Sequence, residues 1–527
     1  MISNRSDDSD AADTTAVLGL PPDRTIGRRQ FLGGTVGLLG LAGLAACTSR
    51  TSAAAAQLIR PTDALVQSAE ARRTGAAAAL HPVDLTARPA TIDLGGPVVD
   101  TWAYGEAVPG ALVRLPAGDR LAATVTNALP DPTSVHWHGI ALRNDMDGVP
   151  GLTQKAIASG GSMTYEFTAP DPGTYMFHSH VGTQLDRGLY APLIVDDPSE
   201  PLAYDAEHIV VLDDWVDGTG RTPDSVLQEL QSGGMDMGGT SMDGMDMGGM
   251  SSSGGAPASP LLGGDAGDVQ YPYYLINGRV ATAPNTVTFT PGTRLRLRII
   301  NLAGDTAFRV ALGGHRMTVV HSDGFPVSPV DTDAILIGMG ERIDVLVTMA
   351  DGVFPLIALA EGKNASALEI VRTGAGAAPT AETRPSELDG QITGALALEA
   401  AEDVFLPERR PDRTHDLVLG GDMAAYQWTI NDRMYSKRRD LQVRPGEVVR
   451  LKMTNSTMMF HPMHLHGHTF QVRSATGRGP RKDTVMVLPG ETVTADLVAD
   501  NPGQWLVHCH NVYHGEAGMM TALSYVK

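Results

Sequence analysis

Polar and apolar residues alternate in short stretches of this chain, as in Arg294-Leu-Arg-Leu-Arg-Ile-Ile300 and Glu447-Val-Val-Arg-Leu-Lys-Met453. Because successive side chains of a β-strand point to opposite faces, such alternation predicts strands. Pro-Gly pairs, which are typical of turns, occur at Pro291-Gly292, Pro445-Gly446 and Pro489-Gly490. The pattern predicts an all-β protein of many short antiparallel strands packed as sandwiches.

Length and charge limit the number of domains and the kinds of partner. A chain of 527 residues is too long for one ordinary domain, and roughly two to four domains are expected. Only 19% of the residues are charged, and the formal net charge is −20. This charge argues against a nucleic-acid partner and favours the approach of small cations.

The N-terminus predicts export. Gly27-Arg28-Arg29-Gln30-Phe31-Leu32 matches a twin-arginine signal, and the apolar stretch Phe31–Ala46 is short enough to suit a signal rather than a membrane span. It ends in Leu44-Ala45-Ala46-Cys47, which resembles a bacterial lipobox. We therefore expect a lipid anchor on Cys47 at the outer face of the cytoplasmic membrane, in the periplasm or cell envelope. The alternative is a plain secretory signal with an incidental Cys.

Composition divides the chain into five segments. Residues 1–47 are the predicted targeting signal, and about 48–80, rich in Ala, Ser and Thr, is predicted to be a tether. Three β-rich segments then cover roughly 81–200, 201–385 and 400–527. No second apolar span follows the signal, so we expect a soluble body.

The two cysteines have separate explanations. If Cys47 carries lipid, Cys509 is the only thiol of the mature protein, so it is available for chemistry rather than for a disulfide. It lies in His508-Cys509-His510, followed by His514 and Met519. On a strand, His508 and His510 would point to one face and Cys509 to the other. One face then offers imidazoles to a metal cluster, and the other offers a thiolate that, with a His and a thioether, makes a blue-copper electron-transfer site.

Three more groups of His accompany this stretch: His136-Trp137-His138-Gly139, His178-Ser179-His180 and His461-Pro462-Met463-His464-Leu465-His466. Ten of the sixteen His residues fall in the four groups. The other six are mostly scattered, as ordinary surface or core residues are.

The first and third β-rich segments contain two copies of one pattern. Pro172-Gly173-Thr-Tyr175-Met-Phe-His178-Ser179-His180 matches Pro502-Gly503-Gln-Trp505-Leu-Val-His508-Cys509-His510, and His136-Trp-His138-Gly139 matches His464-Leu-His466-Gly467. Two such copies facing each other would bring eight H-x-H imidazoles together. Ser179 stands where Cys509 stands, so the first copy is predicted to supply cluster ligands but no blue-copper site.

The second segment contains a low-complexity insert at residues 233–256. Its Gly and Ser content cannot form a packed core, which predicts an exposed loop. Exposed thioethers beside carboxylates suit Cu(I). The candidate Cu(I) ligands in this loop are Met235, Met237, Met242, Met245, Met247 and Met250. The alternative is an insert without function.

With these motifs the chain resembles the multicopper oxidase family, which includes laccases and bacterial cuprous oxidases. The resemblance spans about 81–527 and has all four copper motifs in family order. Together with the signal, the lipobox and the Met-rich insert, it is most similar to actinobacterial, mycobacterial-type lipoprotein multicopper oxidases of copper resistance.

The resemblance implies three cupredoxin-like Greek-key β-sandwich domains and four copper ions. The type 1 copper would be held by His461, Cys509 and His514, with Met519 axial. The type 2 copper would be held by His136 and His464. The type 3 pair would be held by six imidazoles, from His138, His178, His180, His466, His508 and His510.

The same resemblance implies an oxidase that couples one-electron oxidation of a substrate to the reduction of O2 to water. Because of the Met-rich insert and the acidic charge, we favour Cu(I) as substrate, with Fe(II) or phenolics also accepted, and a role in copper tolerance. The alternatives are a laccase acting mainly on phenols or aromatic amines, and a copper-sequestering lipoprotein. We expect a monomer.

Two carboxylates are candidates for proton delivery. Asp147, in Asp145-Met-Asp147-Gly148, lies where family members have an acid near the three-copper centre, although Asp-Gly is also an ordinary turn pair. Many bacterial relatives have Glu directly after the second type 1 His. This chain has Gly515 there and Glu516 one residue later.

Overall fold

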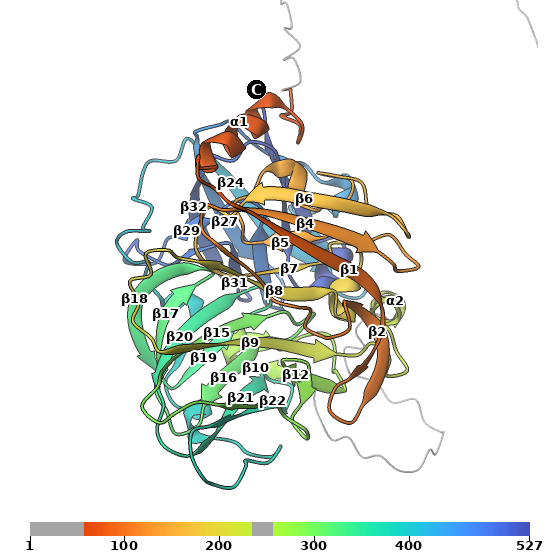
Figure 1. Cartoon of the computed structure of the whole chain (residues 1–527). Coiled ribbons are helices and arrows are strands. Elements are labelled where there is room, and N and C mark those ends of the chain that lie inside the picture. Colours follow the sequence, from red (N-terminus) through yellow and green to blue (C-terminus); the bar gives the residue numbers. More distant parts are fainter. Residues whose placement is uncertain (1–56, 234–256) are drawn as a thin grey trace, which may run out of the picture. The chain divides into compact units, whose positions relative to one another are not determined.

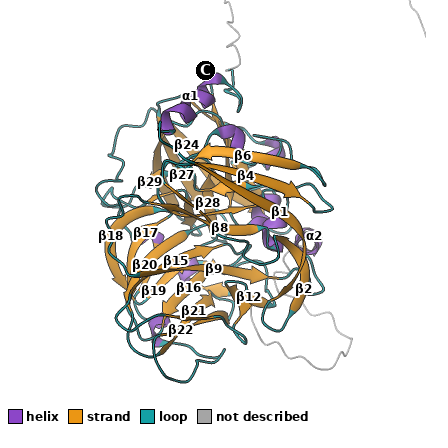
Figure 2. Cartoon of the chain, in the orientation of Figure 1, coloured by secondary structure: helices purple, strands orange, loops and turns teal. Residues whose placement is uncertain are grey.

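The computed structural model describes residues 57–233 and 257–527. Within them, strands dominate and the α-helices are α1 (Ala64–Arg73), α2 (Pro223–Gly233) and α3 (Val512–Glu516) (Figure 2). The strands form three successive pairs of sheets (Figure 1), which confirms the predicted all-β fold of three sandwiches. The targeting signal 1–47 and all but the first residue of the Met-rich insert lie outside the described residues.

The first sandwich has the sheets β2-β1-β4-β6 and β3-β8-β7-β5. The first sheet consists of β1 (Leu80–Asp93), β2 (Val98–Tyr104), β4 (Arg120–Asn127) and β6 (Ser162–Thr168). The second consists of β3 (Val113–Pro116), β5 (His136–His138), β7 (Gly173–His178) and β8 (Tyr190–Asp196). Two 3-10 turns, η1 (Asn144–Met146) and η2 (Gln184–Arg187), lie in its loops.

The second sandwich has a seven-stranded and a six-stranded sheet. The seven strands are β9 (Ala206–Trp215), β12 (Tyr273–Ile276), β13 (Arg279–Val280), β15 (Arg294–Asn301), β17 (Met317–Ser322), β18 (Phe325–Thr332) and β20 (Arg342–Thr348). The six are β14 (Thr286–Thr288), β16 (Phe308–Leu312), β19 (Ala334–Ile337), β21 (Val353–Ala360), β22 (Ala365–Arg372) and β23 (Ile392–Gly394). Short accessory elements are β10 (Ala258–Ser259), β11 (Gly264–Asp265), η3 (Pro260–Leu262), η4 (Ser386–Asp389) and η5 (Ala395–Ala397). Because β23 pairs with β19, this sandwich extends beyond the predicted boundary at 385.

The third sandwich has a six-stranded and a five-stranded sheet. The six strands are β24 (Arg413–Asp422), β25 (Gln427–Ile430), β27 (Val448–Asn455), β29 (Phe470–Val472), β30 (Arg481–Lys482) and β32 (Thr492–Val498). The five are β26 (Leu441–Val443), β28 (His461–Leu465), β31 (Thr484–Val487), β33 (Gln504–Cys509) and β34 (Met520–Tyr525), and η6 (Tyr435–Lys437) precedes β26.

The three sandwiches share one topology. In each, the long first strand pairs antiparallel with the next strand of its own sheet and parallel with a later one, as β1 does with β2 and β4. The strands β9 and β24 repeat this arrangement in the second and third sandwiches. The predicted duplication of the first and third segments is therefore part of a threefold structural repeat.

The two strands that show polar and apolar alternation in the sequence differ in the burial of their polar residues. Along β27 from Val448 to Met453, the apolar residues are buried and the two polar residues are less so, as in a strand with one face toward the core. Along β15, Arg296 and Arg298 are buried as well. Both guanidinium groups bond the buried carboxylate of Asp344, and Arg298 also bonds Thr174 of the first sandwich. These polar side chains are buried because two sandwiches meet there.

The prediction that residues 48–80 form a tether is wrong from residue 57 on, where the structure describes the chain. Helix α1 buries Val66 and Ala69, which lie three residues apart and so share one face of the helix. The Ile59 N–H donates to the Tyr525 carbonyl at 2.8 Å in the third sandwich. The Glu70 carboxylate accepts from the Thr168 N–H at 2.7 Å in the first. Residues 57–74 therefore join the first and third sandwiches.

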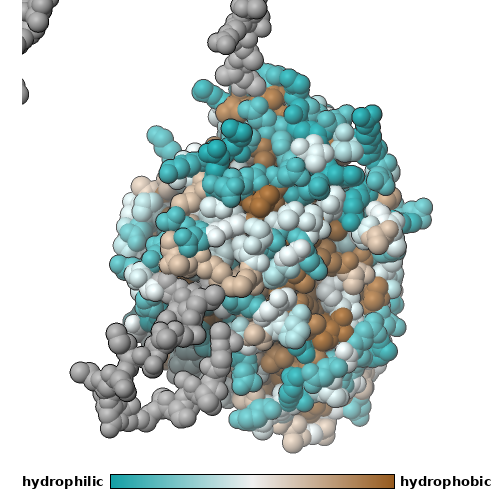
Figure 3. Space-filling view, turned by 180° about the vertical axis from the view of Figure 1, so that it is seen from behind, coloured by the Kyte–Doolittle hydropathy of each residue, from teal (hydrophilic) through white to brown (hydrophobic). Residues whose placement is uncertain are grey.

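The face seen in Figure 3 is mainly polar, with small apolar groups. Among the described residues, no helix has the length and apolar character needed to cross a membrane.

Candidate metal centre

Strand pairing positions the histidines of both copies in the same way. In the first sandwich, His136 on β5 lies opposite His178 on β7. In the third, His464 on β28 lies opposite His508 on β33. The two sandwiches face each other, so that the His136 ring stacks on that of His466 with centroids 3.7 Å apart. The eight H-x-H imidazoles thus meet at one interface, as the duplication predicts.

Within this interface the imidazoles fall into compact groups. Two groups of three have ligand atoms within 4.8 Å of one another: His138, His178 and His510, and His180, His466 and His508. The remaining two rings, of His136 and His464, approach each other with their Nε2 atoms 3.4 Å apart. Each group contains residues of both the first and the third sandwich, so neither sandwich completes it alone.

Backbone carbonyls set the orientation of four of these rings. The Nδ1–H of His136 donates to the Asp147 carbonyl at 2.9 Å, and that of His464 donates to the Asp483 carbonyl at 2.9 Å. His178 and His508 donate in the same way to the carbonyl of the next residue. When Nδ1 carries the proton, Nε2 has a free lone pair, which is the form that binds a metal.

Two buried carboxylates orient further rings across the interface. Asp147 accepts from Nδ1 of His466 at 3.0 Å, and Asp483 accepts from Nε2 of His138 at 3.0 Å. Burial raises the pKa of Asp147. Burial alone would do the same to Asp483, but the guanidinium of Arg342 outweighs it and holds the pKa of Asp483 well below its usual value. The sequence indicated Asp147 and missed Asp483.

The imidazole nitrogens of the centre have the properties of metal ligands. Burial lowers the pKa of His178 to about 3, which keeps the ring neutral. Five buried ring nitrogens have no hydrogen-bond partner among the described residues: Nδ1 of His138, Nε2 of His178, Nε2 of His180, and both nitrogens of His510. Buried polar atoms are rarely left unpaired. Imidazole is a good ligand for copper, and copper bound here would satisfy one nitrogen of each of these rings, so the residues fit the metal that the sequence implies.

A separate thiolate site lies on the other face of β33. The Sγ of Cys509 is 3.7 Å from Nδ1 of both His461 and His514, and these two nitrogens are 3.1 Å apart. All three side chains are buried. Met519 is buried as well, and its carbonyl accepts from the Cys509 N–H at 3.0 Å. A thiolate with two imidazoles is a donor set for copper in an electron-transfer site.

Alternation along β33 relates the two sites as predicted. His508 and His510 belong to the two groups of three imidazoles, and Cys509 belongs to the thiolate site. A short stretch of backbone therefore joins the sites, with no further residue between them.

The outer nitrogens of the thiolate site are also bonded. Nε2 of His461 lies 2.8 Å from the Thr457 hydroxyl, and Nε2 of His514 lies 2.9 Å from Oδ2 of Asp268. Sequence reasoning missed Asp268, because it lies 246 positions from His514 in no recognisable motif. It lines a surface pocket of about 260 Å³ whose other walls come from Val269, Gln270, Arg221 and the α2 residues Val226, Glu229 and Leu230.

A small cavity adjoins the imidazole groups. It measures about 30 Å³ and is lined by His178, His180, His508, His510 and Glu516, among others. This is enough space for a water molecule or a diatomic gas. Burial raises the pKa of Glu516 to about 7. Glu516 thus faces the imidazoles although it is one residue later than the Glu of many bacterial relatives.

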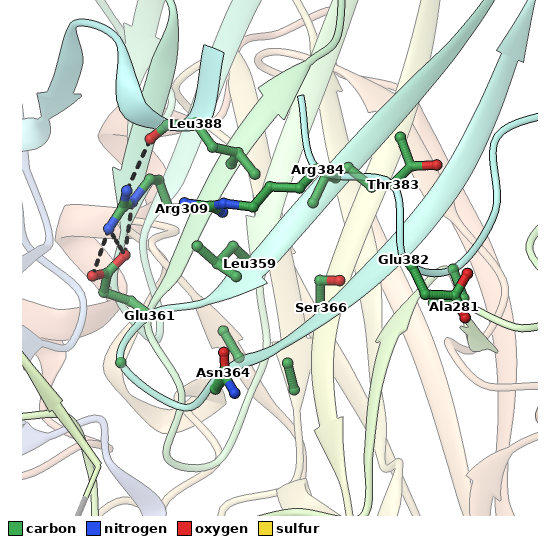
Figure 4. A pocket seen from close by; sticks show the side chains of 15 residues that line it. Ala281, Arg309, Leu359, Glu361, Asn364, Ser366, Glu382, Thr383, Arg384 and Leu388 are labelled. Atoms are coloured by element: carbon green, nitrogen blue, oxygen red, sulfur yellow. Dashed lines mark hydrogen bonds and ion pairs between the residues drawn. The ribbon is translucent and has the colours of Figure 1, made fainter. Parts of the chain in front are cut away.

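The larger groove in Figure 4 has different chemistry. It lies in the second sandwich, measures about 650 Å³ and is lined by residues such as Arg309, Glu361, Glu382 and Arg384, without His or Cys. The Arg309 guanidinium bonds the Glu361 carboxylate and the Leu388 carbonyl across one end of it. The groove therefore lacks the imidazole and thiol groups of the candidate centre. The candidate Cu(I) ligands Met235, Met237, Met242, Met245, Met247 and Met250 lie outside the described residues.

Comparisons with known proteins agree with this geometry. The multicopper oxidase family matches residues 86–200, 207–376 and 408–526. The chain is 52% identical to Multicopper oxidase MmcO of Mycobacterium tuberculosis, over 95% of this chain and 97% of that protein. It is 29% identical to a Copper resistance protein A homolog of Pseudomonas syringae pv. tomato, over 83% of this chain and 91% of the relative. The crystal structure of a laccase from Botrytis aclada superposes with a TM-score of 0.69 at 25% identity, covering 85% of this chain and 88% of the laccase.

Proposed function

This chain belongs to the multicopper oxidase family, and from that premise we propose that it oxidises Cu(I) and reduces dioxygen to water in copper tolerance. The observation that carries the proposal is the pairing of a buried thiolate site with eight converging imidazoles through the adjacent residues His508, Cys509 and His510. An oxidoreductase with copper as cofactor follows from the family. The number of coppers, their ligands and the substrate are part of the proposal.

The proposed type 1 ligands are His461, Cys509 and His514, with Met519 axial. For type 2 they are His136 and His464. The type 3 pair takes the two groups of three imidazoles, from His138, His178 and His510 and from His180, His466 and His508. Support comes from the ring nitrogens that face one another while the opposite nitrogens are bonded to protein oxygens. Four copper ions would supply the four electrons that convert one O2 to two water molecules.

The residues around the two sites have separate tasks in this proposal. The buried Asp268 carboxylate bonds the His514 ring, and Asp268 is also one of the residues that line the surface pocket, so a reductant bound in that pocket is separated from the type 1 site by this residue. Glu516 lines the small cavity beside the type 3 imidazoles, where a carboxyl group can supply protons to the oxygen that is reduced. Asp147, bonded to His466, is the second proposed proton carrier.

Cu(I) is the proposed substrate because the surface pocket beside the type 1 site contains acidic residues, and the sequence of the neighbouring insert is rich in Met and Asp. The pocket combines Asp268 with Glu229 of α2, and α2 ends at Gly233, where the Met-rich insert begins. The net charge of −20 favours the approach of a cation. The printed name of the Pseudomonas relative, a copper resistance protein, agrees with this assignment.

A laccase activity on phenols is the second candidate. Val226, Leu230 and Val269 give the surface pocket an apolar side that suits an aromatic ring. Deletion of residues 234–256 separates the two: we expect cuprous oxidation to fall much more than oxidation of an organic dye or of Fe(II). Equal losses on all substrates would mean that the insert only supports folding, and phenols would become the favoured substrate class.

A storage role is separated from catalysis by oxygen uptake. Copper-loaded protein should be blue and should consume one O2 for every four Cu(I) ions oxidised. A blue protein that takes up no oxygen when given Cu(I) would favour the copper-sequestering alternative.

For localisation we propose twin-arginine export and a lipid on Cys47 at the outer face of the cytoplasmic membrane, with a monomeric body. The support is the sequence Arg28-Arg29 and the lipobox-like Leu44-Ala45-Ala46-Cys47. Replacing Cys47 by Ala should release the protein from the membrane fraction. If the variant stays membrane-bound, the anchor is elsewhere.

A further inference from the structure

Asp483 is the counterpart of Asp147 in the third sandwich. The carbonyl of each Asp accepts from the first His of its own H-x-H pair, which is His136 for Asp147 and His464 for Asp483. Each carboxylate then bonds the second His of the opposite sandwich, which is His466 for Asp147 and His138 for Asp483. The two Asp residues therefore cross-link the duplicated copies through their imidazoles.

The two carboxylates differ in their contacts with basic side chains. Arg342 of β20, in the second sandwich, donates to both oxygens of Asp483, at 2.7 and 2.5 Å. Its Nε donates to the Thr174 carbonyl of the first sandwich at 3.1 Å. One fully buried guanidinium thus contacts the first and third sandwiches from the second. Neither Arg nor Lys forms an ion pair with Asp147 among the described residues.

A second layer fixes this pair in position. Asp323 accepts from the Arg342 N–H at 3.0 Å and from the Thr484 N–H at 3.1 Å. The Lys482 ammonium lies 3.1 Å from Asp323. Gly139 has φ +84°, and a Cβ there would lie 2.6 Å from Nη2 of Arg342 and 2.7 Å from Oδ2 of Asp483. Any side chain at position 139 would therefore displace the ion pair.

We infer that Asp483 is a positioning residue of the copper centre and that Arg342 holds it, so the sandwich without predicted ligands shapes the site that the other two share. The carboxylate accepts the proton of His138 Nε2, which leaves Nδ1 of that ring bare and unpaired toward His178 and His510. The bidentate bond from Arg342 fixes the plane of the carboxylate, and hence the plane of the imidazole. The inference rests on the proposed copper assignment of His138 and His464.

The test compares Asp483→Asn with Asp344→Asn. Asp344 is a matched control, because it is another buried carboxylate between sandwiches that accepts from two guanidinium groups, but it contacts none of the proposed ligands. Each variant, loaded with copper and dialysed against a chelator, is analysed for copper per protein, visible colour and the electron paramagnetic resonance spectrum of type 2 copper. Arg342→Lys, which keeps the charge but loses the two-pronged bond, provides a milder change if Asp483→Asn folds poorly.

We expect Asp483→Asn to stay blue but to bind copper 10- to 100-fold more weakly in the three-copper centre, with an altered type 2 spectrum. Arg342→Lys should shift the same spectrum less. Asp344→Asn should melt at a lower temperature yet keep its copper and its spectrum. Full copper and an unchanged type 2 spectrum in Asp483→Asn would overturn the inference, as would equal copper loss in the control. Wild-type protein without a three-copper centre would overturn the proposed function as well, which distinguishes the two failures.

Discussion

The first and third sandwiches use the same strand pairs to present the same imidazoles, yet only the third has the thiolate site. Ser179 occupies the position of Cys509, and its hydroxyl donates to Gln184 at 2.7 Å. The Cys509 sulfur instead faces His461 and His514. The imidazole cluster thus depends on what the two copies share, whereas the proposed electron-transfer site depends on residues around one position in one copy.

A second contrast concerns charge. Asp147 and Asp483 make equivalent bonds to the imidazoles, but of the two only Asp483 also accepts hydrogen bonds from a guanidinium group, that of Arg342. The duplicated scaffold therefore contains one carboxylate that is fixed as an anion and one that has only His partners. The predictions below separate what the copies share from what distinguishes them.

The largest effect is expected for Cys509→Ser. The variant should lose its blue colour and its oxidase activity to background, because a hydroxyl does not replace the thiolate as a soft ligand. It should remain folded, since the change is nearly isosteric. Visible absorption, oxygen uptake and circular dichroism check the three expectations.

The reciprocal change, Ser179→Cys, sharpens the comparison. We expect no second blue band, since Gln184 and Thr133 rather than two imidazoles surround this position. A new blue absorption in that variant would show that the backbone pattern alone suffices to build the site.

Glu516→Gln should lower oxygen turnover by about 100-fold, the scale of a lost general acid, and leave the colour unchanged. Glu516 lines the cavity beside the imidazoles from the third sandwich, whereas the residues that the first sandwich contributes to the cavity include no carboxylate. Turnover with saturating Cu(I) measures the effect. Wild-type turnover in the variant would remove Glu516 from the proposed proton route.

The paired carboxylates should differ in stability when each is changed to Asn. Asp483→Asn removes the carboxylate that binds both ends of the buried Arg342 guanidinium, which costs about 3–5 kcal/mol, whereas Asp147→Asn loses hydrogen bonds worth about 1–3 kcal/mol. Chemical denaturation of the copper-free variants measures both losses. Equal losses would mean that Arg342 does not distinguish the two copies.

Acid should weaken the contact between the first and second sandwiches. Burial alone would raise the pKa of Asp344, but Arg296 and Arg298 outweigh it and lower the pKa. A lowered pKa stabilises the fold above the ordinary Asp value of about 3.9, and this contribution is lost as the pH falls through the lower folded value. The stability gap between wild type and Asp344→Asn should therefore be wide at pH 7 and narrow below about pH 4. A gap independent of pH would contradict this assignment.

The smallest effect is expected for Val66→Ala in α1, the segment that joins the first and third sandwiches. Val66 is fully buried, and its truncation should cost about 1–2 kcal/mol of stability without changing colour or turnover. Thermal melting measures the loss, and Leu65→Ala on the exposed side of α1 is the control. Equal melting shifts in the two variants would mean that α1 does not pack as described.

The sequence predicted those parts of the molecule that depend on local patterns. The alternation along the strands and the repeated H-x-H pairs predicted the sandwiches and the convergence of the imidazoles. Asp483 was missed because its contact with His138 spans 345 positions and no spacing rule covers it. Helix α1 was misread as a tether because two buried side chains, Val66 and Ala69, leave a weak pattern in an Ala-rich stretch. The burial of Arg296 and Arg298 could not be predicted from the alternating pattern, because it depends on the packing of two sandwiches.

The most direct test of the central claim is a crystal structure of the copper-loaded protein with an anomalous copper map. We expect one peak among His461, Cys509 and His514 and three peaks among the eight imidazoles that the first and third sandwiches share. A Cys509 sulfur without a copper peak, or copper bound by one sandwich alone, would contradict the account.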